Sequence, residues 1–198
     1  MTTRKQDKQA PYHRPTNEQA RSREWLEIQE IERLMTAAAK LGRHGHRDRT
    51  MILMAFRHGL RVAELVDLQW TDVNFAERKI FIRRLKGSND SMHHLERDEI
   101  AALRRLGGDQ SGFIFLAEGG GPMCSSGFFK VIRRAGLEAG LPLKLHPHML
   151  RHSCGYALAN KHVNLRFIQD WLGHRSIANT VKYTALSPLR YAKAGLWK

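Results

Sequence analysis

The chain has 198 residues, enough for one domain with a short appendage, and 42% of them are hydrophobic, which allows a substantial buried core. Its 33 lysines and arginines outnumber 19 aspartates and glutamates, and the formal net charge of +14 points to a polyanionic partner, nucleic acid before an anionic membrane surface. No apolar run is long enough to cross a bilayer, and the N-terminus lacks the apolar segment of a secretory signal.

The chain begins with a polar, basic, aperiodic segment over residues 1–24. It is typical of a flexible arm that reaches DNA phosphates or of a disordered solubilising tail, and the two are compatible. A helix is predicted next, because apolar residues recur at i, i+3, i+4 and i+7 from Ile31 to Ala38. A second helix is expected over about residues 47–58, with Gly59 as its left-handed C-cap.

The spacing of the hydrophobic residues changes in the middle of the chain. RVAELVDLQW predicts a third, short helix, and in KIFIRRLKGSNDSMHHL the alternation around Ile80 and Ile82, followed by turn residues, predicts a β-hairpin. RDEIAALRRL is helical again, and GFIFLA is a candidate short strand that EGGGP ends.

The C-terminal half is mainly helical. SSGFFKVIRRAGLEAG predicts a helix opened by serine and closed by Gly140. Three more helical segments follow in PHMLRHSCGYALAN, NLRFIQDWLG and SIANTVKYT. The predicted fold class is therefore mainly α with a small antiparallel β-sheet (α+β), in one domain.

Cysteine and histidine usage favours neither a disulfide framework nor a metal site. Cys124 and Cys154 form no CxxC motif, so both are expected to be reduced, as in the cytoplasm. The 11 histidines show no repeated ligand spacing, so no metal is predicted.

Short boxes with cationic residues stand apart in the sequence. GLRVAEL places Arg61 directly after a Gly-Leu pair, and HPHMLRH places His148 and Arg151 at i and i+3, on one helical face. LGHRSIANTVKYT holds His174 and, nine positions later, Tyr183. Each residue alone has an ordinary structural interpretation, such as core packing for the tyrosine, and only their combination and order favour a functional one.

These boxes resemble the signature boxes of the tyrosine recombinases, the phage integrase family. The resemblance covers about residues 25–185, identified as a catalytic domain, and HPHMLRHSCGYALAN is most similar to the small recombinases that invert fimbrial promoter segments. Residues 1–24 are too few for the separate N-terminal DNA-binding domain of most members, so none is expected. The tail, residues 186–198, is predicted either to be exchanged between protomers or to pack on its own domain.

The resemblance implies a site-specific recombinase in which Tyr183 attacks a DNA phosphate to form a 3′-phosphotyrosine. Arg61 and Arg151 then hold the non-bridging oxygens, since guanidinium forks suit a phosphorane's charge. Glu64 is expected to support Arg61, with a simple ion pair as the alternative. The bond energy stays in the phosphotyrosine, so no ATP, metal or other cofactor is expected.

Proton transfers are assigned by the same resemblance. A phenol has a pKa of about 10, so Tyr183 needs help to lose its proton, and His148 is expected to assist. His174 is expected to hydrogen-bond the phosphate. Lys86, on the predicted hairpin, is expected to protonate the leaving 5′-oxygen, with Arg83 and Arg84 as rivals.

The predicted partner is double-stranded DNA, bound by a homo-oligomer that is a tetramer on synapsed sites, with DNA-bending proteins as candidate accessories and no membrane. The predicted location is the cytoplasm, with the nucleoid. A non-catalytic DNA-binding regulator and a type IB topoisomerase are the alternatives. DNA contacts outside the site, or merely a solvated helix face, are predicted at Arg84, Ser125, Ser126, Lys130, Arg133 and Arg134.

Overall fold

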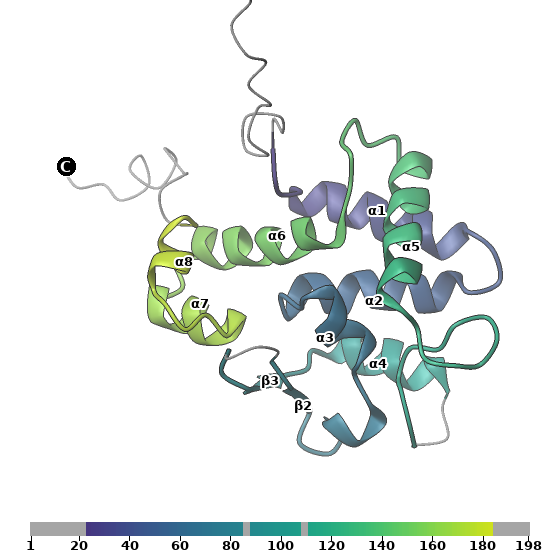
Figure 1. Cartoon of the computed structure of the whole chain (residues 1–198), viewed down its shortest axis with the longest axis horizontal. Coiled ribbons are helices and arrows are strands. Elements are labelled where there is room, and N and C mark those ends of the chain that lie inside the picture. Colours follow the sequence, from purple (N-terminus) through teal and green to yellow (C-terminus); the bar gives the residue numbers. More distant parts are fainter. Residues whose placement is uncertain (1–22, 85–87, 108–110, 184–198) are drawn as a thin grey trace, which may run out of the picture.

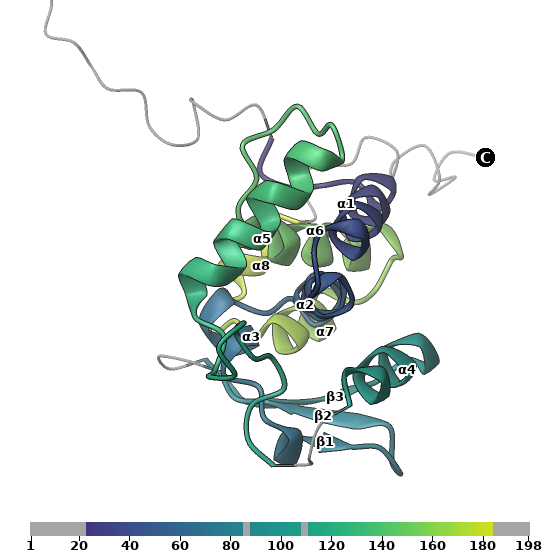
Figure 2. The ribbon, with the colours of Figure 1, turned by 90° about the vertical axis from the view of Figure 1, so that its right-hand side faces the viewer.

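One small sheet lies at one end of a mainly helical domain in the computed structural model, which describes residues 23–84, 88–107 and 111–183 (Figures 1 and 2). The predicted arm and tail therefore lie outside the described residues, apart from residues 23 and 24. In chain order the elements are α1 (Ile28–Lys40), α2 (Gly45–Arg57), α3 (Val62–Val66), the 3-10 helix η1 (Trp70–Asp72), β1 (Val73–Asn74), β2 (Lys79–Ile82), β3 (Ser91–His94), α4 (Arg97–Leu106), α5 (Ser125–Glu138), α6 (Pro147–Asn160), α7 (Leu165–Leu172) and α8 (Ala178–Val181).

The sheet confirms the predicted hairpin and adds a strand. β2 and β3 pair antiparallel with Ile80 opposite His93, and β1 pairs with β2 on the other side. β1 has only two residues, too few to show an alternating pattern in the sequence.

The strand predicted in GFIFLA is wrong. This segment forms isolated bridges, Gln69 with Phe113 and Leu116 with Pro122, instead of a strand. Ile114 and Phe115 are both buried, so neighbouring side chains enter the core together and do not alternate between two faces.

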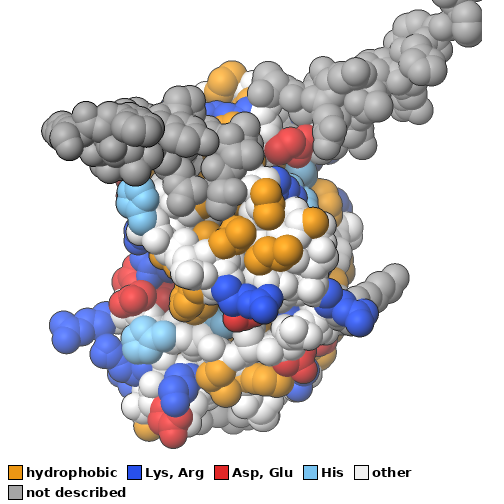
Figure 3. Space-filling model, turned by 90° about the vertical axis from the view of Figure 1, so that its left-hand side faces the viewer, with side chains coloured by type: hydrophobic (Ala, Val, Ile, Leu, Met, Phe, Trp, Pro, Cys, Tyr) orange, Lys and Arg blue, Asp and Glu red, His pale blue; other side chains and the backbone are white. Residues whose placement is uncertain are grey.

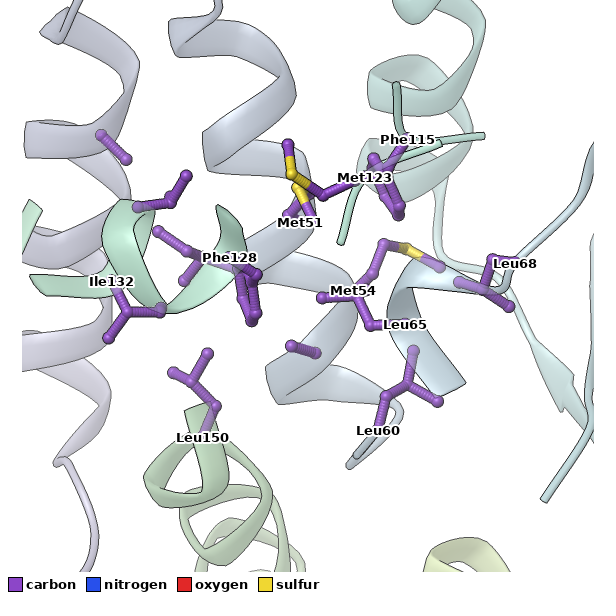
Figure 4. Packing of buried hydrophobic residues seen from close by; sticks show 14 of the residues in the cluster. Met51, Met54, Leu60, Leu65, Leu68, Phe115, Met123, Phe128, Ile132 and Leu150 are labelled. Atoms are coloured by element: carbon purple, nitrogen blue, oxygen red, sulfur yellow. The ribbon is translucent and has the colours of Figure 1, made fainter. Parts of the chain in front are cut away.

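Helix α2 lies at the centre of the main core (Figure 4). Met51 to Ala55 are buried without interruption, which is the pattern of a helix enclosed on all sides. It packs against α1, α4 and α6, while Phe128 of α5 and Leu150 of α6 enter the same core.

A smaller cluster joins the C-terminal helices to the end of α2. Cys154 and Ala159 of α6 pack there with Ile168, Leu172 and Tyr183. Gly59 allows the approach: its φ is +57°, and a Cβ at this position would lie 2.3 Å from a methyl carbon of Leu172. None of the helices in the described ranges is long and apolar enough to cross a membrane.

Candidate active site

Glu64, buried on α3, is the carboxylate on which three arginines converge. Arg61 Nη1 donates to its Oε1 at 2.6 Å, Arg84 Nη1 donates to its Oε2 at 2.8 Å, and Arg151 Nη1 lies 3.9 Å from Oε2. Burial alone would raise the pKa of Glu64, but the charge of Arg84 and the hydrogen bonds from Arg61 outweigh it, and the pKa lies below its usual value. Glu64 is thus ionised and contacts more arginines than Arg61 alone.

Arg151 is held at the ends of two helices. Its Nη1 donates to the carbonyl of Gly59 at 2.5 Å and its Nη2 to the carbonyl of Leu172 at 2.6 Å, where α2 and α7 end. Carbonyls at helix C-termini lack intrahelical partners and favour a cation. Burial, and then the charges of the neighbouring arginines, lower the pKa of Arg151 to about 10, so it remains cationic at neutral pH.

Tyr183 is only 2% exposed and packs on α6. Its ring covers Gly155 and meets Tyr156 edge-on, with centroids 5.1 Å apart. A hydrogen bond of 3.1 Å joins its hydroxyl to His152 Nδ1, and the ring of His174 stacks at 6.3 Å. Burial raises the pKa of Tyr183 more than the charge of Arg151 lowers it, so the hydroxyl carries its proton in this structure.

Of the two predicted histidines, His174 lies against this tyrosine and His148 lies behind His152. His148 lies in the first turn of α6 with its ring edge-on to His152 at 4.5 Å, and His174 follows α7, where its Nδ1 is 2.9 Å from Thr180 Oγ1. Burial, followed by the charge of Arg151 and other cations, lowers the pKa of His148 to about 4 and that of His174 to about 3. Both imidazoles are therefore neutral at pH 7.

Lys86 lies outside the described residues, but Arg83 and Arg84, the alternative candidates for the acid that protonates the 5′-oxygen, are described. The side chain of Arg84 is fully buried, and besides Glu64 it donates to the carbonyl of Trp171 at 2.5 Å. Arg83 points outward and pairs with Asp72. This inward and outward alternation continues the period of β2, and the burial of Arg84 does not fit its predicted contact with DNA.

The predicted DNA-contact residues of α5 are mostly on the surface. The N-cap is Cys124, not a serine as predicted, and the side chain of Ser126 lies 3.2 Å from its sulfur. Arg134 is partly exposed and donates to Asp48 at 3.1 Å. Ser125 is half-buried, and the exposed members of the set are Ser126, Lys130, Arg133 and Arg134.

A buried histidine network near the site was not foreseen. His58 Nδ1 lies 3.0 Å from His93 Nδ1, His58 Nε2 lies 3.0 Å from Glu99, and the ring of His93 stacks on Trp171 at 3.8 Å. The network ties β3 to the ends of α2 and α7 and the start of α4. Its members are far apart in sequence, so no spacing signalled it.

His152 was also missed, although it stands next to Arg151 in the second box. Helical geometry could have revealed it, because His148 and His152 are four residues apart and therefore lie on the same face of a helix. Among the described residues, no group of three or more histidines, cysteines or carboxylates could hold a metal ion.

Comparison with known proteins agrees with this geometry. The model of the phage integrase family matches residues 24–190. The type 1 fimbriae regulatory protein FimE of Escherichia coli (strain K12) is 42% identical over 184 residues, which cover 89% of this chain and 91% of FimE. The type 1 fimbriae regulatory protein FimB of the same strain is 39% identical over 184 residues, which cover 89% of this chain and 90% of FimB. The crystal structure of XerA recombinase aligns with a TM-score of 0.72 and 29% identity, over 86% of this chain and 63% of that one. The chain therefore belongs to the phage integrase family and is a tyrosine recombinase.

Proposed function

We propose that this chain recombines double-stranded DNA at specific sites by forming a 3′-phosphotyrosine at Tyr183. The observation that carries the proposal is that Arg61 and Arg151, which meet at Glu64, lie near enough for their charges to act on the pKa of Tyr183, while His174 reaches the tyrosine from a third segment. Glu64 holds the two arginines, and His174 stacks on the ring of Tyr183. Tyr183 is 2% exposed, so we expect DNA binding to uncover it.

In the proposed reaction Arg61 and Arg151 bind the non-bridging oxygens of the scissile phosphate. Donors aimed at charge that develops in the transition state contribute about 10²–10³ in rate each. His174 donates a further hydrogen bond to the phosphate, and His148 assists removal of the tyrosine proton. The Tyr183 oxygen replaces the 5′-oxygen on phosphorus, and the leaving oxygen is protonated by Lys86.

We propose that the working assembly is a tetramer on two synapsed sites in the cytoplasm, at the nucleoid, with DNA-bending proteins as accessories. The basic arm and α5 supply backbone contacts, and the tail is exchanged between protomers or packed in cis. On the side that carries α7 and α8, hydrophobic side chains are exposed beside lysines and arginines (Figure 3); Phe167 and Ile177 are 47% and 40% exposed. This surface suits protein contacts next to DNA. Integration, excision or inversion would follow from how the two sites are arranged.

Covalent trapping tests the proposal. The protein is mixed with fragmented host DNA and denatured in detergent, and the ends of the protein-linked fragments are sequenced. We expect adducts at a few sequences with the wild type and none with Tyr183→Phe, which should still bind DNA because the ring remains. Adducts in Tyr183→Phe would show that another residue is the nucleophile. Wild-type adducts scattered without sequence preference would favour a topoisomerase. Salt-sensitive DNA binding by the wild type without any adducts would favour a DNA-binding regulator.

Lys86→Ala is expected to slow cleavage at the mapped site by about 10²–10⁴, the usual contribution of a general acid. A 5′-bridging sulfur at the scissile phosphate should restore most of the rate, because a thiolate leaves without protonation. The measurement is the single-turnover rate on both substrates, with Lys161→Ala, on the exposed end of α6, as the matched control. If sulfur does not rescue the variant, Lys86 is not the acid.

A further inference from the structure

The hydroxyl of Tyr183 is bound by a histidine that none of the predicted roles uses. His152 Nδ1 lies 3.1 Å from Tyr183 Oη, and the two rings are 6.0 Å apart. His148, the residue expected to assist Tyr183, instead meets the ring of His152 edge-on at 4.5 Å. His152 thus stands between the tyrosine and His148.

Helix α6 also determines where the tyrosine ring lies. A Cβ at Gly155 would be 2.6 Å from Tyr183 Cζ and 2.7 Å from both Cε atoms, so the ring rests on the bare helix backbone. Gly155 and His152 are three residues apart and therefore lie on one face of α6. The same helix carries Arg151, so a single rigid element holds the hydroxyl and one phosphate-binding arginine in a defined relation.

The charge state of His152 suits a proton acceptor. Its ring is half-buried, and burial, followed by the charges of Lys182, His148, Arg151 and His146, lowers its pKa to about 3. At pH 7 the imidazole is neutral, and in the tautomer protonated at Nε2 its Nδ1 accepts the hydrogen bond of the phenol. Tyr183, whose own pKa is raised, keeps its proton while DNA is absent.

A DNA phosphate changes this balance. Apart from burial, the groups that depress the pKa of His152 are cations or become cations on protonation. A phosphate bound at Arg61 and Arg151 brings negative charge into their midst, which favours the imidazolium form of His152. The same charge disfavours a free phenolate, so the proton leaves Tyr183 as its oxygen bonds to phosphorus and not before. The substrate itself therefore makes His152 a better acceptor at the moment when the proton must leave.

We propose that His152 is the catalytic residue that takes the proton of Tyr183, an inference that rests on Tyr183 being the nucleophile. The proton moves from Oη to Nδ1 as Oη bonds to phosphorus; the bond from phosphorus to the 5′-oxygen breaks, and that oxygen takes a proton from the acid assigned to Lys86. Rejoining runs in reverse and returns the proton from His152 to Tyr183. His148 then contacts His152 and not the nucleophile itself, so it assists the proton transfer indirectly.

Two substitutions separate binding the hydroxyl from accepting its proton. His152→Asn keeps a hydrogen-bond acceptor close to the position of Nδ1 but is not basic, whereas His152→Leu has no acceptor. The first readout is acetylation of Tyr183 by N-acetylimidazole in the DNA-free protein, followed by peptide mass spectrometry. We expect protection in the wild type and His152→Asn and faster acetylation in His152→Leu. Equal protection in all three would show that His152 does not hold the hydroxyl, and would overturn the proposal even if no adduct could be trapped.

The second readout is the rate of adduct formation on fragmented DNA as pH rises. We expect both variants to be slower than wild type by about 10²-fold at pH 7, with unchanged DNA binding, and to recover as hydroxide replaces the base. His94→Asn, on the exposed face of β3, is the matched control and should behave as wild type. A wild-type rate in His152→Asn would overturn the proton transfer. Adducts in Tyr183→Phe would instead overturn the proposed function, so the two failures are distinguishable.

Discussion

Replacing Glu64 with alanine is expected to lower the free energy of unfolding by about 3–5 kcal/mol, a large part of the 5–15 kcal/mol typical of a domain. Removal of one partner leaves the others charged and buried. The side chain of Arg84 is fully buried and that of Arg151 is 2% exposed, so neither guanidinium can regain water without unfolding its surroundings. The loss should therefore resemble a broken buried ion pair and not a surface one.

Urea denaturation followed by circular dichroism measures this change. Glu138→Ala, at the exposed end of α5, is the control and should change stability by no more than about 0.5 kcal/mol. The pKa of Glu64 is lowered in the folded state, so its contribution is present above the ordinary glutamate pKa and disappears as the pH falls through the lowered value. The difference in the free energy of unfolding between the wild type and Glu64→Ala should therefore become smaller at acidic pH. A loss below about 1 kcal/mol at pH 7 would show that the arginines do not depend on Glu64.

Replacing Arg151 with lysine is expected to slow adduct formation by about 10²–10³, while DNA binding changes much less. The guanidinium spans the carbonyls of Gly59 and Leu172 and still has N–H groups for a phosphate. One ammonium cannot span both carbonyls and also present a fork, although the charge is kept. The effect should therefore fall on the transition state and not on general attraction to DNA.

Single-turnover trapping at saturating protein, beside a filter-binding titration, checks this expectation. Arg33→Lys is the matched control, because Arg33 also donates to a backbone carbonyl, that of Ala139, but on the exposed surface of α1. The control should form adducts at the wild-type rate. Equal rates for Arg151→Lys and the wild type would mean that the charge of Arg151 suffices and that its bidentate geometry has no role.

Local sequence was sufficient for most of the fold. Helix α1 and the hairpin were predictable because burial of one face imposes a period of 3.6 or 2 on neighbouring residues. Gly59 was predictable as a helix end because a residue there must adopt a positive φ. By contrast the sequence pattern does not predict β1, since two residues carry no period, and it wrongly predicts a strand in GFIFLA, because a short apolar run also suits a buried connection.

The sequence by itself determined the family and the residues expected at the site, because Arg61, Arg151, His174 and Tyr183 stand in boxes with specific spacing. Only the tertiary structure decided how side chains pair across long separations. It placed Arg84 inside on Glu64, 20 positions away, where the sequence suggested a DNA contact, and it brought His152 to Tyr183 across 31 positions. Local periodicity records which face of an element is buried. It does not record which polar groups meet there, because that choice depends on how distant helices and strands pack together.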